Sequence, residues 1–341
     1  MIKAMKNNSG LFLCLVLLMW GCASAGDKNI EKAEARGIYH YNITLAPDLS
    51  NRVDMKIHPK PIEDSLIISS TLDLVQDILH AGHRDTDQKD SYSVSFINQG
   101  LIRMYDVNQD KLNLDFARFK NQAARMDFIK GRNTYKDCGL TEVVDDFKLE
   151  CNRMYHKALQ KPYGADLWSF LQHGIDETNV KKAESPFVYA DQKFQNKYKN
   201  ILILLTDGYI ESGLSADAAR GLSKNQSYDL GESRIRAFRN AYKASGMTDM
   251  KAFFKKNNYG IIPLTNKHIE NLNILVLEMC DRSLTSSGNA SVYPTDADVM
   301  ELFWTDWLRN SNVKSLELKR CFPDGRRAER TIKNFILKQS L

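Results

Sequence analysis

The sequence Ile201-Leu202-Ile203-Leu204-Leu205-Thr206-Asp207-Gly208 indicates the fold of this chain most clearly. Its first five residues are all apolar, and the Asp-Gly pair that ends it is typical of a turn. A short apolar run of this kind is typical of a central parallel strand that is buried on both faces. The run Ile274-Leu275-Val276-Leu277 has the same character. We therefore expect two buried parallel strands in the second half of the chain.

Helices and further strands alternate around these two runs. Alternating apolar residues predict strands at residues 38–45, 92–97 and 315–320. Apolar residues at helical spacing predict helices at residues 65–80 and 296–310, two more between the apolar strands, and a basic helix at 326–338. Strands that alternate with helices are typical of an α/β fold, with a mostly parallel sheet and helices on both faces.

Residues 101–162 depart from this alternation. They are rich in Lys and helical in pattern, for example at Leu140, Phe147 and Cys151, and they contain no convincing strand. The segment is too regular to be a structureless loop. We interpret it as a helical insertion into the α/β domain.

The composition excludes several classes of protein. The chain has 341 residues, of which 43% are hydrophobic and 26% charged, with 8 Pro and 18 Gly, which excludes a collagen-like or disordered chain. The net charge of +5 is too small for a dedicated nucleic-acid binder, so no nucleic-acid partner is expected.

The N-terminus has the pattern of a secretory signal peptide over residues 1–21. Lys3 and Lys6 precede an apolar run at residues 11–20, and small residues follow it. The run is too short to span a bilayer as a stable anchor. Export of the chain is therefore expected.

The cleavage site has two interpretations. Gly21-Cys22 resembles a bacterial lipoprotein box, although Met19 and Trp20 depart from it. Cys22 would then be the lipidated first residue of a membrane-anchored envelope lipoprotein, and residues 22–36 would form a tether. The alternative is cleavage after Ala25, which would give a soluble periplasmic protein.

Four cysteines lie beyond Cys22, namely Cys138, Cys151, Cys280 and Cys321. Export implies an oxidising compartment, where pairing is allowed. A helix between Cys138 and Cys151 would hold them about 20 Å apart, so these two should not pair. Cys280 and Cys321 lie in or at the ends of predicted strands and could meet. Free buried thiols are the alternative.

Oxygen-bearing side chains follow two of the predicted strands. Asp48 and Ser50 come after the first strand, and Asp207 comes after the strongest one. Ligands of open α/β sheets bind beyond the carboxyl ends of the strands. If the two strands are neighbours, these side chains converge, and oxygen ligands of this kind suit Mg²⁺, Mn²⁺ or Ca²⁺.

At these residues the chain resembles the von Willebrand factor type A family. The metal-ion-dependent adhesion site of that family uses Asp-x-Ser-x-Ser, a Thr in a middle loop and a later Asp. Asp48 and Ser50 match the first two ligands, Asp207 matches the last, and residues 164–168 look like the middle loop. The resemblance implies a Rossmann-like fold over residues 37–341 and contact with a protein partner at the strand ends.

Two departures make the predicted metal site degenerate. Arg52 stands at the second Ser, and Ala165 stands where the Thr is expected. The permanent charge of Arg52 could replace the cation and pair with Asp48 or Asp207, so that no ion binds. Alternatively, both aspartates only cap turns and helices.

Three functions remain open. The first is a non-enzymatic binding or assembly module of the cell envelope that contacts a protein partner at the strand ends. The second is a metal-dependent periplasmic hydrolase that uses Asp48 and Asp207. The third is a structural envelope protein with an inert site, in which residues 101–162 bind the partner. The sequence has no catalytic motif such as a nucleophile elbow or a P-loop, which favours the first.

Overall fold

The computed structural model describes residues 34–81, 87–131, 139–213, 222–285 and 287–339. The chain divides into two compact units. The smaller comprises, of the described residues, 34–39 and 183–197, and the larger comprises the rest. In the smaller unit β4 (Phe187–Tyr189) pairs antiparallel with the start of β5 (Gln192–Leu205), with Phe187 opposite Phe194.

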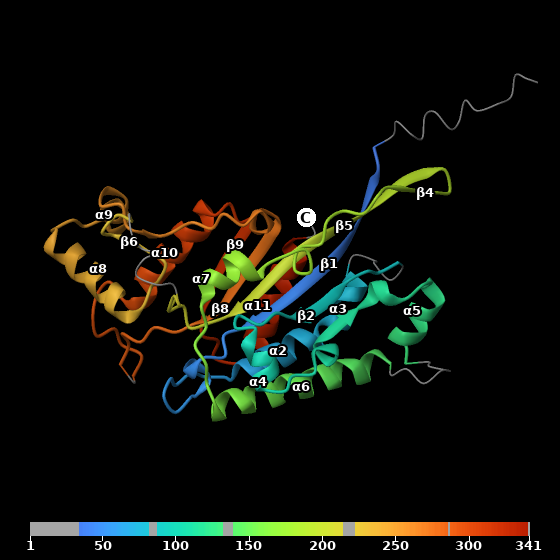
Figure 1. The fold of residues 1–341 in the computed structure, drawn as a ribbon, viewed down its shortest axis with the longest axis horizontal. Helices are drawn as coiled ribbons and strands as arrows, with labels where there is room; N and C mark the ends of the chain where they lie inside the picture. The colour runs from blue at the N-terminus through green and yellow to red at the C-terminus, as the bar shows by residue number, and fades with distance from the viewer. Residues whose placement is uncertain (1–33, 82–86, 132–138, 214–221, 286, 340–341) are drawn as a thin grey trace, which may run out of the picture. The chain divides into compact units, whose positions relative to one another are not determined.

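The strand order of the main sheet is that of a doubly wound fold. The strands β1 (Arg36–Pro47), β2 (Ser91–Val94), β3 (Asn113–Asp115), β5, β8 (Leu272–Met279) and β9 (Ser315–Arg320) lie in the order β3-β2-β1-β5-β8-β9. This is the 3-2-1-4-5-6 order of Rossmann-like sheets. The pairs β1–β2, β5–β8 and β8–β9 are parallel, and β3 is antiparallel to β2. The predicted fold class is thereby confirmed (Figure 1).

Helices lie where the apolar spacing predicts them, except that the helix predicted at residues 65–80 is divided into two at Leu74. They are α2 (Asp64–Asp73), α3 (Val75–His80), α4 (Gly100–Met104), α5 (Gln122–Ile129), α6 (Leu140–Gln160), α7 (Leu167–Ser169), α8 (Glu232–Ala244), α9 (Met250–Lys256), α10 (Asp296–Asn310) and α11 (Gly325–Lys338). A small second sheet pairs β6 (Gln226–Ser227) with β7 (Gly260–Ile261).

The run that predicted the central strand is buried on both faces. Ile201, Ile203 and Leu205 belong to the core that includes buried residues of α2, α3, α6 and α11. Leu202 and Leu204 belong to the core that includes those of α8, α9 and α10. Burial of each such side chain contributes about 1.5–3 kcal/mol, so this strand anchors both helix layers.

The segment 101–162 is mostly helical, as expected, but it also contains a strand. β3 forms the edge of the sheet and pairs with β2, with Leu114 opposite Tyr92. A three-residue strand with one apolar residue gives no alternating pattern, which is why the sequence did not indicate it. α6 contributes the buried side chains of Phe147 and Met154 to the core. The segment is therefore part of the sheet and of its core.

Several predictions concern residues that lie outside the described ranges. These are the signal peptide 1–21, lipidation at Cys22, most of the tether 22–36, and the separation of Cys138 from Cys151. Among the described residues, none of the helices is both long and apolar enough to cross a membrane.

Candidate functional site

The first strand and the strongest strand are neighbours at the point where the strand order reverses. The chain proceeds from β1 outward to β2 and β3, and later from β5 outward to β8 and β9. Ligands of doubly wound sheets bind at this switch point. Asp48 directly follows β1, and Asp207 lies two residues beyond β5. The N–H of Asp48 donates to the carbonyl of Leu205 at 2.9 Å, so both predicted site residues lie at one edge of the sheet.

Gly208 lets the chain turn sharply behind Asp207. Its φ is +89°, a left-handed value that favours glycine, and a Cβ there would lie 3.0 Å from Sδ of Met300. The indole N–H of Trp304 donates to its carbonyl at 2.8 Å. The Asp-Gly pair that predicted a turn thus also packs closely against α10.

The carboxylate of Asp48 is buried and bonded internally. Oδ1 accepts the N–H of Ser50 at 3.0 Å, and Oδ2 accepts the hydroxyl of Thr206 at 3.2 Å. Burial raises the pKa of Asp48, and the charge of Asp207 adds to this rise against the opposing charge of Arg52. The two carboxylates therefore lie close enough for the charge of Asp207 to oppose ionisation of Asp48.

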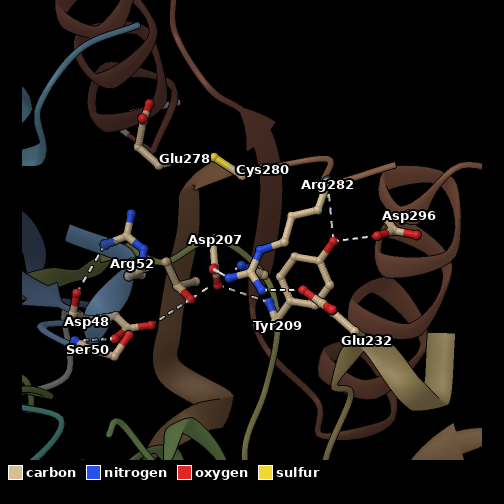
Figure 2. A network of polar contacts seen from close by, with 12 residues as sticks. Asp48, Ser50, Arg52, Asp207, Tyr209, Glu232, Glu278, Cys280, Arg282 and Asp296 are labelled. Carbon is tan, nitrogen blue, oxygen red and sulfur yellow. Dashed lines mark hydrogen bonds and ion pairs between the residues drawn. The ribbon is translucent and has the colours of Figure 1, made fainter. Parts of the chain in front are cut away.

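Asp207 is paired with an arginine that comes from the end of β8. Its Oδ1 accepts the N–H of Tyr209 at 3.2 Å, and its Oδ2 accepts Nη2–H of Arg282 at 2.6 Å. Nη1 of Arg282 donates to Glu232 at 2.5 Å, and Glu232 lies in the first turn of α8 (Figure 2). One guanidinium therefore joins the loops after β5 and β8 to the start of α8.

The guanidinium of Arg282 also stacks on an aromatic ring. Its Cζ lies 4.3 Å from the centre of the Tyr209 ring. The hydroxyl of Tyr209 donates to Asp296 at 2.5 Å, and Arg239 pairs with the other oxygen of Asp296. The ring of Tyr209 and the carboxylates of Asp207 and Glu232 together hold Arg282 in one orientation (Figure 2).

One interpretation expected Arg52 to pair with the carboxylate of Asp48 or Asp207. The structure shows other partners for it. Its Nη1 donates to Asp64 at 2.5 Å and to the main-chain carbonyl of Asp48 at 3.0 Å. Lys60 pairs with the same Asp64. Burial opposes ionisation of Asp64, but the charges of Arg52 and Lys60 lower its pKa. An acidic residue on α2 therefore draws Arg52 away from the strand ends.

Arg282 was not among the site residues predicted from the sequence. It lies three residues beyond the end of β8, so the reasoning on strand ends that selected Asp48 and Asp207 also applies to it. Polar residues follow most strands, however, and no pattern states which of them reaches across to a neighbouring loop. The sequence thus indicated the edge of the sheet but not this partner.

The middle loop supplies no oxygen ligand at the expected position. Ala165 and Gly164 line the same pocket as Asp48 and Asp207. Asp166 next to them caps α7 by accepting the N–H of Ser169 at 2.9 Å, and it accepts the N–H of Gly213 at 2.8 Å. The carboxylate of Asp166 therefore stabilises the loop and the start of α7 through these hydrogen bonds.

A pocket of about 900 Å³ opens at this edge of the sheet. Its charged lining comprises five carboxylates, two guanidinium groups and one imidazole, from Asp48, Asp207, Glu211, Asp229, Glu232, Arg236, Arg282 and His58. Its lining is therefore mostly acidic.

A divalent ion bound by Asp48, Ser50 and Asp207 stays a prediction, and it would have to share carboxylate oxygens that already accept hydrogen bonds. All four carboxylate oxygens already accept a hydrogen bond, and Arg282 covers one of them. The part of the chain that the structure describes contains no group of three or more His, Cys, Asp or Glu that could hold a metal. Both aspartates bond to the N–H two residues ahead, as the turn-capping interpretation expected. Arg282 supplies the positive charge at this site.

Two cysteines lie beside this site. Cys280 and Cys321, which we expected to be able to meet, have their sulfur atoms 2.6 Å apart. Glu278 precedes them in the bulged end of β8, with φ +69°. Burial raises the pKa of Glu278 to about 7, and the charge of Asp64 adds to the rise. Cys151 is buried within α6.

Comparison with known proteins shows distant likenesses to several solved structures. No family model matches the chain, and no curated protein matches it. An aerotolerance-related membrane protein from Bacteroides fragilis is 9% identical, with 87% of this chain and 99% of that chain covered and a TM-score of 0.25. The pilus adhesin SpaC from Lactobacillus rhamnosus is 10% identical, with 90% and 31% covered and a TM-score of 0.34. The PilB minor pilin from Streptococcus sanguinis is 12% identical, with 91% and 64% covered and a TM-score of 0.30. These likenesses are too distant to bring a function to this chain.

Proposed function

We propose that residues 37–341 form a von Willebrand factor A-like binding or assembly module of the bacterial cell envelope. A protein partner binds in the pocket at the strand ends, and the module is not an enzyme. The observation that carries the proposal is the Asp207–Arg282–Glu232 cluster at the switch point of the sheet. It keeps charge ordered at a binding edge without using a metal.

The alternative, a metal-dependent hydrolase, finds less support in this geometry. Its two carboxylates would have to coordinate a cation or accept a proton from water. Asp48 and Asp207 instead accept hydrogen bonds from their own turns, from Thr206 and from Arg282. These internal bonds suit carboxylates that hold a surface in shape.

The lining of the pocket indicates the chemistry of the partner. The single positive charge of Arg282 offsets only one of the two carboxylates that it contacts, those of Asp207 and Glu232. Asp229 has a counter-charge in Arg234 at 3.6 Å. Of the remaining carboxylates, Glu211 is exposed. An excess of negative charge favours a partner segment that carries Lys or Arg.

Photo-crosslinking tests the location of the partner surface. A photo-reactive residue replaces Ser233, which is exposed in the pocket, in the full chain within the source bacterium. A second variant carries it at Leu149, which is 64% exposed on α6. The proposal expects a discrete protein adduct from position 233 alone. An adduct from position 149 alone would favour the third hypothesis, and none from position 233 would contradict the proposal.

Labelled peptides test the charge of the partner. Fluorescent 15-residue peptides rich in Lys are compared with acidic peptides of equal length by anisotropy. Glu211→Gln should weaken binding of the basic peptides about fivefold, because one exposed charge pair is worth up to about 1 kcal/mol. Arg236→Gln, at an exposed position in the same pocket, should strengthen it. Tighter binding of acidic peptides would contradict a basic partner.

Anchoring through lipid on Cys22 belongs to the same proposal. The box at Gly21-Cys22 and the polar residues after it support a lipid-anchored module rather than a soluble periplasmic one. Mass spectrometry of the mature N-terminus tests this, with Cys22→Ser as the matched control. Diacylated Cys22 at the mature start is the expected result, and a start at Gly26 would contradict it.

A further inference from the structure

Two cysteines meet where neighbouring parallel strands end. Cys280 is the first residue after β8, and Cys321 is the first residue after β9. The strands pair in parallel, with Met279 opposite Arg320, so the cysteines follow a register pair directly. Their sulfur atoms are 2.6 Å apart, and both residues are partly accessible. Sheet pairing between β8 and β9, which resumes after a bulge at Met279 and Arg320, therefore holds the two thiols together.

We propose that Cys280 and Cys321 form a reversible disulfide that clamps the end of β8 at the binding edge. The oxidant is a disulfide, such as oxidised glutathione or a thiol–disulfide oxidoreductase. The two thiols release two protons and two electrons, and one S–S bond forms between Cys280 and Cys321. The S–S bond of the oxidant breaks, and its two sulfur atoms take up the protons and electrons as thiols.

The clamp lies next to the cation of the proposed binding pocket. The N–H of Cys280 donates to the main-chain carbonyl of Asp207 at 3.0 Å. Two residues later, Arg282 pairs with the carboxylate of the same Asp207 at 2.6 Å. Cys280 and Arg282 lie on the same short segment (Figure 2), so a bond from Cys280 to Cys321 would restrain the part of the chain that carries Arg282. The disulfide state thus controls how firmly Arg282 is held over Asp207.

A third described cysteine provides an internal control. Cys151 is 1% exposed and lies within α6, where its neighbours are core side chains. Burial raises the pKa of its thiol to about 12, so little of it is the reactive thiolate. It should remain a free thiol in both states.

Differential alkylation of the wild-type full chain tests the bond without any variant that must fold. The chain is isolated from the envelope of the source bacterium and, in a second arm, reduced and then equilibrated with oxidised glutathione. Each sample is denatured, blocked with N-ethylmaleimide, reduced, labelled with iodoacetamide and analysed by peptide mass spectrometry. Cys280 and Cys321 should carry the second label, and Cys151 the first. N-ethylmaleimide on both Cys280 and Cys321 in the glutathione arm, or a bond from either to Cys138, would overturn the proposal.

Hydrogen–deuterium exchange tests the clamp. The segment 279–283 should exchange several-fold more slowly in the oxidised chain than in the reduced chain, and the thermal midpoint should rise by several degrees. The double variant Cys280→Ser/Cys321→Ser should show neither response to oxidised glutathione. Equal exchange in oxidised and reduced wild type would refute control of Arg282, whatever the result of the partner experiments.

Discussion

Arg282 and Asp207 pair across two neighbouring loops, with 2.6 Å between Nη2 and Oδ2. Asp207 follows β5 and Arg282 follows β8, and these strands are parallel neighbours in the sheet. The side chain of Asp207 is 8% exposed and that of Arg282 is 29% exposed. A buried carboxylate without this partner would be an uncompensated charge, so the pair matters for stability as well as for binding.

Replacing Arg282 by Ala should lower the free energy of unfolding by about 3 kcal/mol, because it leaves Asp207 uncompensated. Arg282→Lys should recover only part of this loss, since an ammonium group cannot bridge Asp207 and Glu232 and stack on Tyr209 as well. Urea unfolding measures both. Arg236→Ala, at an exposed position of the same pocket, should change stability by less than about 0.5 kcal/mol. An equal, small effect of both alanine variants would refute the role given to Arg282.

Divalent ions should leave the thermal midpoint of the wild-type chain unchanged. Arg282 already supplies the positive charge beside Asp207, so we expect no strong binding of an ion at Asp48, Ser50 and Asp207. A ligand at 100 times its dissociation constant would stabilise the fold by about 2.7 kcal/mol, which scanning calorimetry detects easily. The scans compare EDTA with millimolar Mg²⁺, Mn²⁺ and Ca²⁺. A rise of several degrees that disappears in Asp207→Ala would establish a metal site and contradict this prediction.

Glu278 should make the chain less stable as the pH rises from about 4.5 to about 7. Its pKa is raised from its ordinary value of 4.5 to about 7, mainly by burial, and its Oε2 has no hydrogen-bond partner among the described residues. The folded chain therefore binds this proton more tightly than the unfolded chain does. Its contribution is complete below pH 4.5 and is lost as the pH passes through 7, by about 3 kcal/mol at most.

Urea unfolding of wild type and Glu278→Gln across pH 4–8 isolates this contribution. The difference between the two stability curves should change by up to about 3 kcal/mol over that range. The exposed Glu301→Gln variant is the control and should follow the wild-type curve. Parallel curves for wild type and Glu278→Gln would show that Glu278 does not titrate there.

Asp64→Asn should destabilise the fold by about 3 kcal/mol or more. Asp64 is the carboxylate partner of the buried cations Arg52 and Lys60, and the change leaves two buried positive charges without it. Asp73→Asn on the same helix is the control, because its side chain is 60% exposed and its pair with Lys148 lies at the surface. Denaturant unfolding should separate the two variants clearly, and equal effects would contradict the assignment.

The sequence predicted much of the architecture because long, regular apolar patterns report which faces are buried. The run at residues 201–205 is a central strand, and the helix predicted at residues 296–310 is α10. The short β3 was missed, since Asn113–Asp115 contains one apolar residue and forms only because β2 lies beside it. The predicted strands ended close to Cys280 and Cys321, which was enough to indicate that the two cysteines could meet.

The sequence by itself determined the α/β fold, the burial of the strand before Asp207, and the edge at which Asp48 and Asp207 lie. These follow from apolar periodicity and from the rule that the carboxyl ends of parallel strands share one edge. Only the tertiary structure decided which arginine serves Asp207. Arg52 lies closer to Asp48 in sequence but pairs with Asp64 on α2, whereas Arg282 reaches Asp207 from β8. Ion pairs depend on side-chain direction across neighbouring loops, and linear spacing carries no record of that direction.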